Sequence, residues 1–158
     1  MRRLALFAAL LPLSGAGAQA PVVPAPVCVR AEVVPGFEGF GKAAPGAPAV
    51  GKAAAVTLTI VDASATAPMP HAPKPGTFLG GFPVSIAKAG TYRIALSHGA
   101  WIDVVGPNGA ATSTAHAHGP ACSGIAKIVS FDLTPGTWQL QVSDAKGPNL
   151  AVMVVAGG

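Results

Sequence analysis

The sequence predicts an all-β protein, an antiparallel sandwich of seven or eight short strands of the jelly-roll or immunoglobulin-like kind. Apolar and polar residues alternate over several short segments, as they do in strands with one buried face. Turn-forming Gly, Pro and Asn residues separate these segments at intervals of about ten residues, which is typical of a sandwich. After the signal-like N-terminus, no part of the sequence has a helical period.

Each expected strand is an alternating or apolar segment that ends at a turn signal. The clearest turn is Gly106-Pro107-Asn108-Gly109. The segments expected to form strands are 55–61, 82–86, 91–96, 100–105, 111–115, 128–133, 138–143 and 150–155. Tyr92 and Trp138 alternate with polar residues and are therefore expected in the core. Trp101 shares its strand face with Asp103 and is the aromatic residue expected to line a ligand site.

Residues 1–18 are typical of a secretory signal peptide. Arg2 and Arg3 precede an apolar run, and small residues follow that run. The run is too short to span a bilayer as a helix. We expect cleavage after Ala18, with Ala20 as the alternative site. The protein is therefore expected to be periplasmic or secreted and to have no transmembrane segment in its mature form.

Residues 19–54 form a lead that is rich in Pro and Ala. Its prolines disfavour both a helix and a central strand, so the lead is expected to be extended or partly disordered. Phe37 and Phe40 are expected to pin it to the domain that follows. The sandwich domain is then expected to span residues 55–158.

The charges of the mature chain are few and scattered. Removing Arg2 and Arg3 with the signal leaves eight Lys and Arg residues against six Asp and Glu residues. The sequence has no basic cluster, which argues against nucleic acid or an acidic membrane surface as a partner. Lys127 is expected to be an ordinary solvated lysine. An envelope or extracellular partner is expected, and its identity stays open.

The chain has two cysteines, Cys28 and Cys122. In an exported protein two cysteines most simply form one disulfide, which would tie the lead to the histidine-rich segment. In the chain-entropy model, closing such a long loop stabilises a protein by about 4–5 kcal/mol. The alternative is that Cys122 is a thiolate ligand of a metal ion and that Cys28 takes no part.

Three of the four histidines fall in a short part of the chain. His116 and His118 are two residues apart in an extended segment, so their imidazoles point to one side and could share an ion. His98, at the end of a strand, would complete a three-histidine site for Zn²⁺ or Cu²⁺. Asp103 or Cys122 would be a fourth ligand or would orient a ligand. The alternative is that these are surface histidines beside a disulfide loop.

Two segments resemble the pre-peptidase C-terminal type of β-sandwich that occurs in secreted bacterial proteins. They are Gly90-Thr91-Tyr92-Arg93-Ile94-Ala95-Leu96 and Trp101-Ile102-Asp103-Val104-Val105, the second followed by the turn Gly106-Pro107-Asn108-Gly109. The resemblance covers residues 82–110 and again 130–155. It implies a fold rather than a function, because it consists of features that many hairpins share.

A second resemblance covers most of the mature chain. The segments 99–104 and 116–127 resemble motifs of a group of small exported bacterial proteins. Some members of that group carry the name homogentisate 1,2-dioxygenase, which would imply an iron site built from His and Glu. Such dioxygenases are longer cupin proteins, and this chain offers only Glu32 and Glu38, both in the lead.

These observations favour an exported binding or accessory module of the cell envelope that holds a transition metal through its histidines, rather than an enzyme. The first alternative is a metal-dependent oxidoreductase of the dioxygenase type that uses the same histidines with Zn, Cu or Fe. The second alternative is a carbohydrate- or protein-binding sandwich without a metal ion. An enzyme would gather the histidines in a cavity beside Trp101 and Asp103, whereas a binding module would scatter them over the surface.

Overall fold

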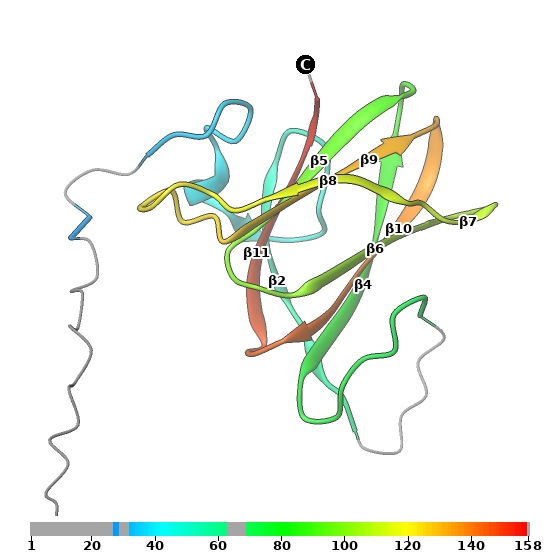
Figure 1. Cartoon of the computed structure of the whole chain (residues 1–158), viewed down its shortest axis with the longest axis horizontal. Helices are drawn as coiled ribbons and strands as arrows, with labels where there is room; N and C mark the ends of the chain where they lie inside the picture. Colours follow the sequence, from blue (N-terminus) through cyan, green and yellow to red (C-terminus); the bar gives the residue numbers. More distant parts are fainter. Residues whose placement is uncertain (1–26, 29–31, 63–68, 158) are drawn as a thin grey trace, which may run out of the picture.

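The computed structural model describes residues 27–28, 32–62 and 69–157, which form two β-sheets (Figure 1). The six-stranded sheet contains, in spatial order, β1 (Ala44–Pro45), β2 (Ala53–Thr57), β11 (Asn149–Ala156), β5 (Gly90–Leu96), β9 (Lys127–Leu133) and β8 (Ser113–Ala117). The five-stranded sheet contains β3 (Thr59–Ile60), β4 (Phe78–Ile86), β10 (Gly136–Ala145), β6 (Trp101–Gly106) and β7 (Gly109–Ala110). All these neighbours are antiparallel except β1 and β2. The predicted all-β sandwich is confirmed.

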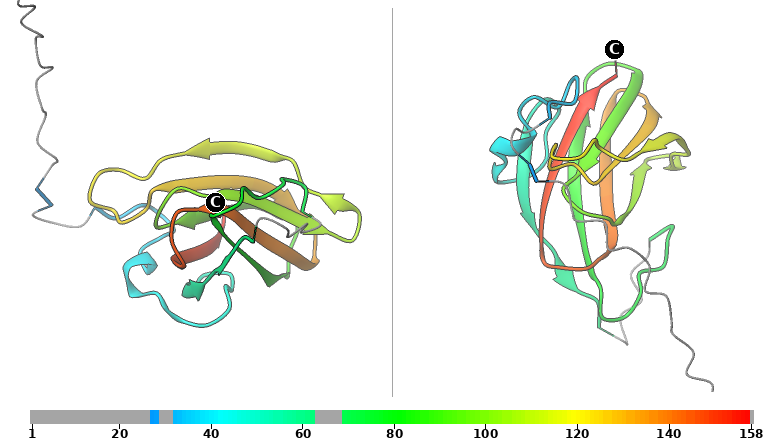
Figure 2. Two further views of the ribbon diagram at one scale, coloured as in Figure 1. Left: turned by 90° about the horizontal axis from the view of Figure 1, so that it is seen from below. Right: turned by 60° about the vertical axis from the view of Figure 1, so that its left-hand side comes forward.

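The two sheets pack against each other around one main hydrophobic core (Figure 2). From β4 onward the chain passes repeatedly from one sheet to the other, so neighbours in sequence often lie in different layers. Every second residue of a strand points inward, and the inward residues here are aliphatic or aromatic. The largest core side chains come from both sheets and are Phe131, Ile94, Leu96, Leu140, Val104, Val142, Val152 and Val154. Tyr92 is buried in this core as predicted, and Trp138 packs against it.

A second, smaller cluster covers the outer face of the six-stranded sheet. Phe37 is 2% exposed and Phe40, in the 3-10 turn η1 (Phe40–Lys42), is 5% exposed. Both pack with residues such as Ile125 and Met153. The prediction that these two aromatic residues pin the lead to the domain is confirmed.

A disulfide fastens the beginning of the described chain to the same region. Cys28 and Cys122 are bonded, with their Cα atoms 5.4 Å apart, so the predicted pairing is confirmed. The backbone N–H of Glu32 also donates to the carbonyl oxygen of Cys122 over 3.3 Å. Cys122 is therefore not free to act as a thiolate ligand. Structural disulfides of this kind form outside the reducing cytoplasm.

The sandwich begins earlier in the chain than predicted. β1 lies within the expected lead and β2 already starts at Ala53, so the boundary at residue 55 moves toward the N-terminus. The segment 55–61, predicted as one strand, is divided between the sheets: β2 pairs with β11, and β3 pairs with β4. Leu58 lies at the crossing, buried, and donates its N–H to Pro148 over 2.6 Å. The apolar alternation continues through this crossing, which is why the pattern predicts a single strand.

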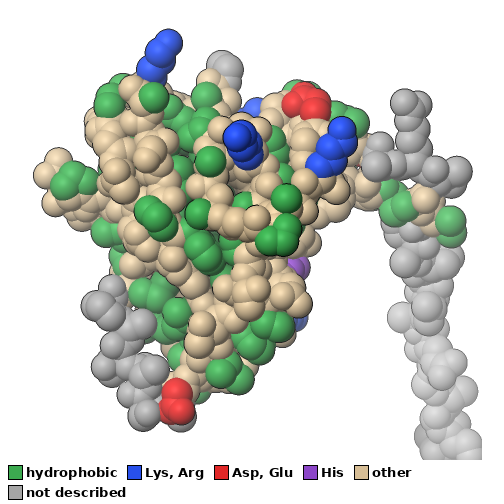
Figure 3. Space-filling view, turned by 180° about the vertical axis from the view of Figure 1, so that it is seen from behind, with side chains coloured by type: hydrophobic (Ala, Val, Ile, Leu, Met, Phe, Trp, Pro, Cys, Tyr) green, Lys and Arg blue, Asp and Glu red, His purple; other side chains and the backbone are tan. Residues whose placement is uncertain are grey.

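The predicted signal peptide, residues 1–18, lies outside the described residues. Within the described residues, no helix combines the length and the apolar character needed to cross a membrane. Figure 3 shows few charged side chains on the face it presents, with acidic and basic ones side by side at its upper edge, in agreement with the sparse charges of the sequence. On this face the described residues form no extended patch of a single charge.

Candidate functional site

Trp101 opens β6 at an edge of the five-stranded sheet. β10 pairs along one side of β6, whereas β7 pairs on the other side only with Val105 and Gly106. The start of β6 is therefore an open edge. Trp101 is 46% exposed, and it is the one aromatic residue among the large hydrophobic residues that lie exposed in the described chain. An indole so exposed is a candidate for binding, provided that it is held in place.

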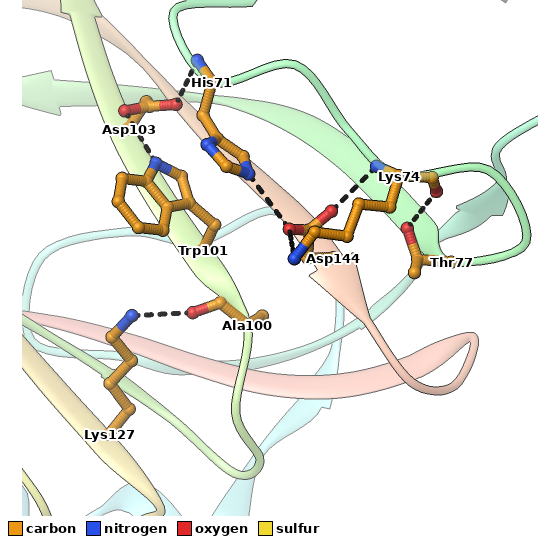
Figure 4. Close-up of polar contacts among 8 residues, drawn as sticks. All are labelled: His71, Lys74, Thr77, Ala100, Trp101, Asp103, Lys127 and Asp144. Carbon is orange, nitrogen blue, oxygen red and sulfur yellow. Dashed lines mark hydrogen bonds and ion pairs between the residues drawn. The ribbon is translucent and has the colours of Figure 1, made fainter.

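Asp103 holds the indole from the same face of β6 (Figure 4). Nε1–H of Trp101 donates to Oδ1 of Asp103 over 3.1 Å. The backbone N–H of His71 donates to the other oxygen, Oδ2, over 3.2 Å. The imidazole of His71 stacks on the indole, with ring centroids 4.3 Å apart and planes inclined by 20°. Both oxygens of Asp103 are thus in use, and Trp101 has a fixed orientation.

His71 is itself anchored by Asp144. Its Nε2 lies 2.9 Å from Oδ2 of Asp144, and Nζ of Lys74 lies 3.2 Å from the same oxygen. The backbone N–H of Lys74 donates to Oδ1 of Asp144 over 2.9 Å. Burial raises the pKa of Asp144, but the bonds from Lys74 and His71 outweigh burial and lower the pKa to about 2. We call Asp103, His71, Lys74 and Asp144 the latch.

The position of Asp144 depends on an irregularity of β10. The register of β10 against β4 shifts between Val142 and Ala145, which marks a β-bulge. Within the bulge Asp144 has a φ of 56°, a left-handed conformation that Asp and Asn adopt more readily than other residues with a side chain. The bulge therefore sets Asp144 outside the regular alternation of the strand, where its carboxylate reaches the loop that carries His71.

A hollow of about 300 Å³ lies beside Trp101, between the open edges of the two sheets. Its lining residues are Trp101, Ile102, Ser113, His116, Lys127 and Val129. β8 is the edge strand of the six-stranded sheet, and His116 stands opposite Val129 in the β8–β9 ladder. Paired side chains point to the same side of a sheet, so His116 faces the hollow with Val129. We call this space the Trp101 hollow.

Lys127 connects the two sheets across the Trp101 hollow. Nζ of Lys127, at the start of β9, donates to the carbonyl oxygen of Ala100, just before β6, over 2.8 Å. The same Nζ lies 5.6 Å from the centroid of the Trp101 ring, within cation–π range. Lys127 is half-buried, and burial lowers the pKa of its ammonium group. The expectation of a solvated lysine is therefore wrong, because the fold brings the edge of β6 over this side chain.

The predicted metal ligands lie in different surroundings. His116 and His118 are exposed neighbours with ring centroids 6.1 Å apart, and Nδ1 of His118 is 2.9 Å from the oxygen of Ala126. Nδ1 of His98, between β5 and β6, is 3.3 Å from Oγ of Ser97. In the part of the chain that the structure describes, no three His, Cys, Asp or Glu side chains form a group that could hold a metal ion. Metal binding by the three histidines stays a prediction.

The sequence did not single out three residues of the latch. His71 and Lys74 lie in a proline-rich connection that reads as a loop, and Asp144 lies near the end of a predicted strand. His71 and Asp144, which are bonded to each other, lie 73 residues apart in the sequence, so no local pattern predicts this contact. The available signal was a histidine and a lysine in a loop that is otherwise apolar and rich in proline.

Comparison of the chain with protein-family models, with curated protein sequences and with solved structures gives no match. The resemblances to pre-peptidase C-terminal domains and to the group of small exported proteins therefore stay predictions. The indole of Trp101 has different surroundings on its two sides. On one side lies the latch, whose carboxylates form hydrogen bonds within the protein. On the other side lies the Trp101 hollow, where Lys127 uses one of its three N–H donors.

Proposed function

We propose that this protein is an exported binding module that holds a carbohydrate at the Trp101 hollow without a metal ion. The observation that carries the proposal is the indole of Trp101, which is 46% exposed and yet fixed by Asp103 and His71. A sugar ring has an apolar face of C–H groups and a rim of hydroxyls, so it can stack on an indole while its rim forms hydrogen bonds. Fixing the indole in advance reduces the entropy lost on binding.

The lining of the Trp101 hollow supports a ligand of this mixed character. Ile102 and Val129 contribute apolar surface, while Ser113, His116 and Lys127 contribute groups that form hydrogen bonds. Small-molecule sites are concave spaces of about 300–1,000 Å³ with mostly apolar walls and a few polar groups that orient the ligand. The Trp101 hollow, at about 300 Å³, is large enough for a single sugar unit of a longer chain.

A protein partner that adds a strand to the edge of β6 is less well supported. Strand addition needs free backbone groups at the edge. Lys127 already occupies the carbonyl oxygen of Ala100, directly before the exposed Trp101. A charged side chain over an edge is a common protection against strand pairing. The site is therefore better suited to a small ligand than to a peptide strand.

Titration of the exported protein with neutral and acidic oligosaccharides tests the proposal. Trp101→Ala is expected to weaken saccharide binding by about thirtyfold, because truncating a central aromatic anchor commonly loses 2 kcal/mol or more. Ile60→Ala is the matched control, since Ile60 is also an exposed large hydrophobic residue, 60% exposed. Ile60→Ala is expected to bind as the unaltered protein does. Failure to bind any saccharide, or unchanged binding by Trp101→Ala, would contradict the proposal.

Metal binding through His116 and His118 is the second candidate function. The favouring observation is that the two rings are exposed neighbours, with centroids 6.1 Å apart, and that His116 also lines the Trp101 hollow. Two imidazoles can begin a transition-metal site that solvent or a ligand completes. Near-stoichiometric Zn, Cu or Fe in the purified protein, lost on the double change His116→Ala/His118→Ala, would support it. Metal content that is negligible in both proteins would leave the metal-free module.

A further inference from the structure

We infer that the ligand of the Trp101 hollow is an acidic saccharide whose carboxylate is bound by Lys127. This inference rests on the proposed carbohydrate-binding function and names the class of sugar. Three observations support it. The ionisable residues that line the hollow are basic. Lys127 has N–H donors without a hydrogen-bond acceptor, and the nearby carboxylate of Asp103 is already bonded to Trp101 and His71.

The ionisable groups that line the Trp101 hollow are both basic. Lys127 and His116 are the titratable residues among its described lining, which contains no carboxylate. The nearest acid along β6 is Asp103, and both of its oxygens are engaged, by Trp101 and by His71. Neither Asp103 nor His71 lines the hollow, so this bonded carboxylate is not part of its wall. An anion entering the hollow therefore meets positive charge without a competing internal acid.

Lys127 has donors to spare at this site. An ammonium group carries three N–H donors, and the structure assigns one of them to the carbonyl oxygen of Ala100. No carboxylate lies within ion-pair distance of Lys127 among the described residues. Burial without a counter-charge disfavours the charged ammonium, which is the cause of its lowered pKa. A bound carboxylate would supply the missing charge and would accept charge-assisted hydrogen bonds.

The position of Lys127 also fits the geometry of a sugar acid. Its Nζ is 5.6 Å from the centroid of the indole, so a sugar ring lying on Trp101 places its rim substituents close to this ammonium. The carboxylate of a uronic acid is such a substituent, one bond away from the ring. Trp101 would thus bind the sugar ring, while Lys127 would bind its carboxylate.

The experiment compares oligogalacturonate with the neutral galacto-oligosaccharide of the same length, and oligoglucuronate with its neutral glucose counterpart. The unaltered protein is expected to bind one of the acidic members about tenfold more tightly than its neutral match, as a charge-assisted pair allows. Lys127→Gln removes the charge but keeps a side-chain N–H donor, so it is expected to lose the preference, with a larger fall in affinity for the acidic sugar than for the neutral one. Lys127→Arg is expected to retain the preference. Added salt should weaken binding of the acidic sugar only.

The outcomes separate this inference from the function on which it rests. Equal affinity for acidic and neutral members would overturn the inference and leave a carbohydrate-binding module. An equal loss of affinity for the acidic and the neutral saccharide in Lys127→Gln would also overturn it. So would a preference for the acidic saccharide that survives in this variant, because Lys127 would then not be the residue that recognises the carboxylate. Absence of binding to all four saccharides would overturn the proposed function itself.

Discussion

The two sides of Trp101 differ in how their charges are used. In the latch, Asp103 bonds to Trp101 and to His71, and Asp144 bonds to His71 and to Lys74. In the Trp101 hollow, Lys127 forms one hydrogen bond and has no acidic partner among the described residues. The same indole thus separates a set of charges that satisfy one another from a charge that lacks an acidic partner among the described residues.

This difference indicates which residues stabilise the fold and which bind. Charges that are bonded within the protein fix the loop around His71 and the orientation of Trp101. Burial disfavours the charge of Lys127, and no acid among the described residues pairs with it, so stability alone explains this charge poorly. Perturbed groups of this kind concentrate at functional sites. Variants in the latch should therefore change stability most, and variants in the hollow should change binding most.

The largest loss of stability is expected for Asp103→Ala. This change removes the acceptor of Nε1–H of Trp101, which is exposed and can turn to water, and of the part-buried N–H of His71, so the two losses together are expected to destabilise the protein by about 1–2 kcal/mol. Urea denaturation measures the effect. Asp103→Asn keeps one side-chain oxygen as an acceptor and should lose roughly half as much. A change below about 0.5 kcal/mol for Asp103→Ala, the size usual at ordinary surface sites, would mean that the latch does not stabilise the fold.

The opposite sign is expected at Ser143, behind the latch. Ser143 stands opposite Trp101 in the β6–β10 ladder, is fully buried, and has no hydrogen-bond partner for Oγ among the described residues. Ser143→Ala removes this unsatisfied hydroxyl and should stabilise the protein by about 1 kcal/mol. A rise of the melting temperature would show it. A fall would mean that the hydroxyl is hydrogen-bonded in solution and belongs to the network of the latch.

Sequence reasoning predicted the parts of this protein that depend on local pattern. Apolar alternation placed Tyr92 in the core, and the export context paired Cys28 with Cys122. It could not show that segment 55–61 divides between two sheets, because the alternation of a strand is the same in either sheet. The fold class was therefore predictable, whereas the layer to which each strand belongs was not.

The candidate site was predictable only in part, for the same reason. Trp101 stood out because it shares a strand face with Asp103, and the structure adds a direct bond between the two side chains. Lys127 and His71 approach that indole from distant parts of the chain, and no local spacing announces such contacts. The histidines attracted a metal hypothesis because His-x-His is a visible motif. A motif such as His-x-His is recognised by the spacing of its residues, whereas a binding site is formed by residues that the fold brings together from distant parts of the chain.

Acid should weaken the latch through Asp144. The pKa of this carboxyl falls from 3.8 to about 2 in the folded protein, so the bonds of Asp144 stabilise the fold fully above pH 4. That contribution is lost as the pH falls from about 4 to about 2. Asp144→Asn is the matched variant, because Asn also tolerates the left-handed backbone at this position. Its melting temperature should be lower than that of the unaltered protein at pH 7, and the difference should shrink as the pH falls below 4 and vanish only below pH 2, where Asp144 is protonated in both states. A constant difference would contradict the predicted linkage.

The smallest effect on stability is expected for His116→Ala, on the side of the hollow. His116 is exposed on β8, and no hydrogen bond of its side chain is found among the described residues, so its removal should change the free energy of unfolding by less than about 0.5 kcal/mol. Saccharide affinity should nevertheless fall severalfold, because His116 lines the Trp101 hollow and offers a donor to the ligand. Denaturation and titration of one preparation measure both effects. A loss of stability as large as that of Asp103→Ala would show that the hollow, like the latch, is built to hold the two sheet edges together rather than to receive a ligand.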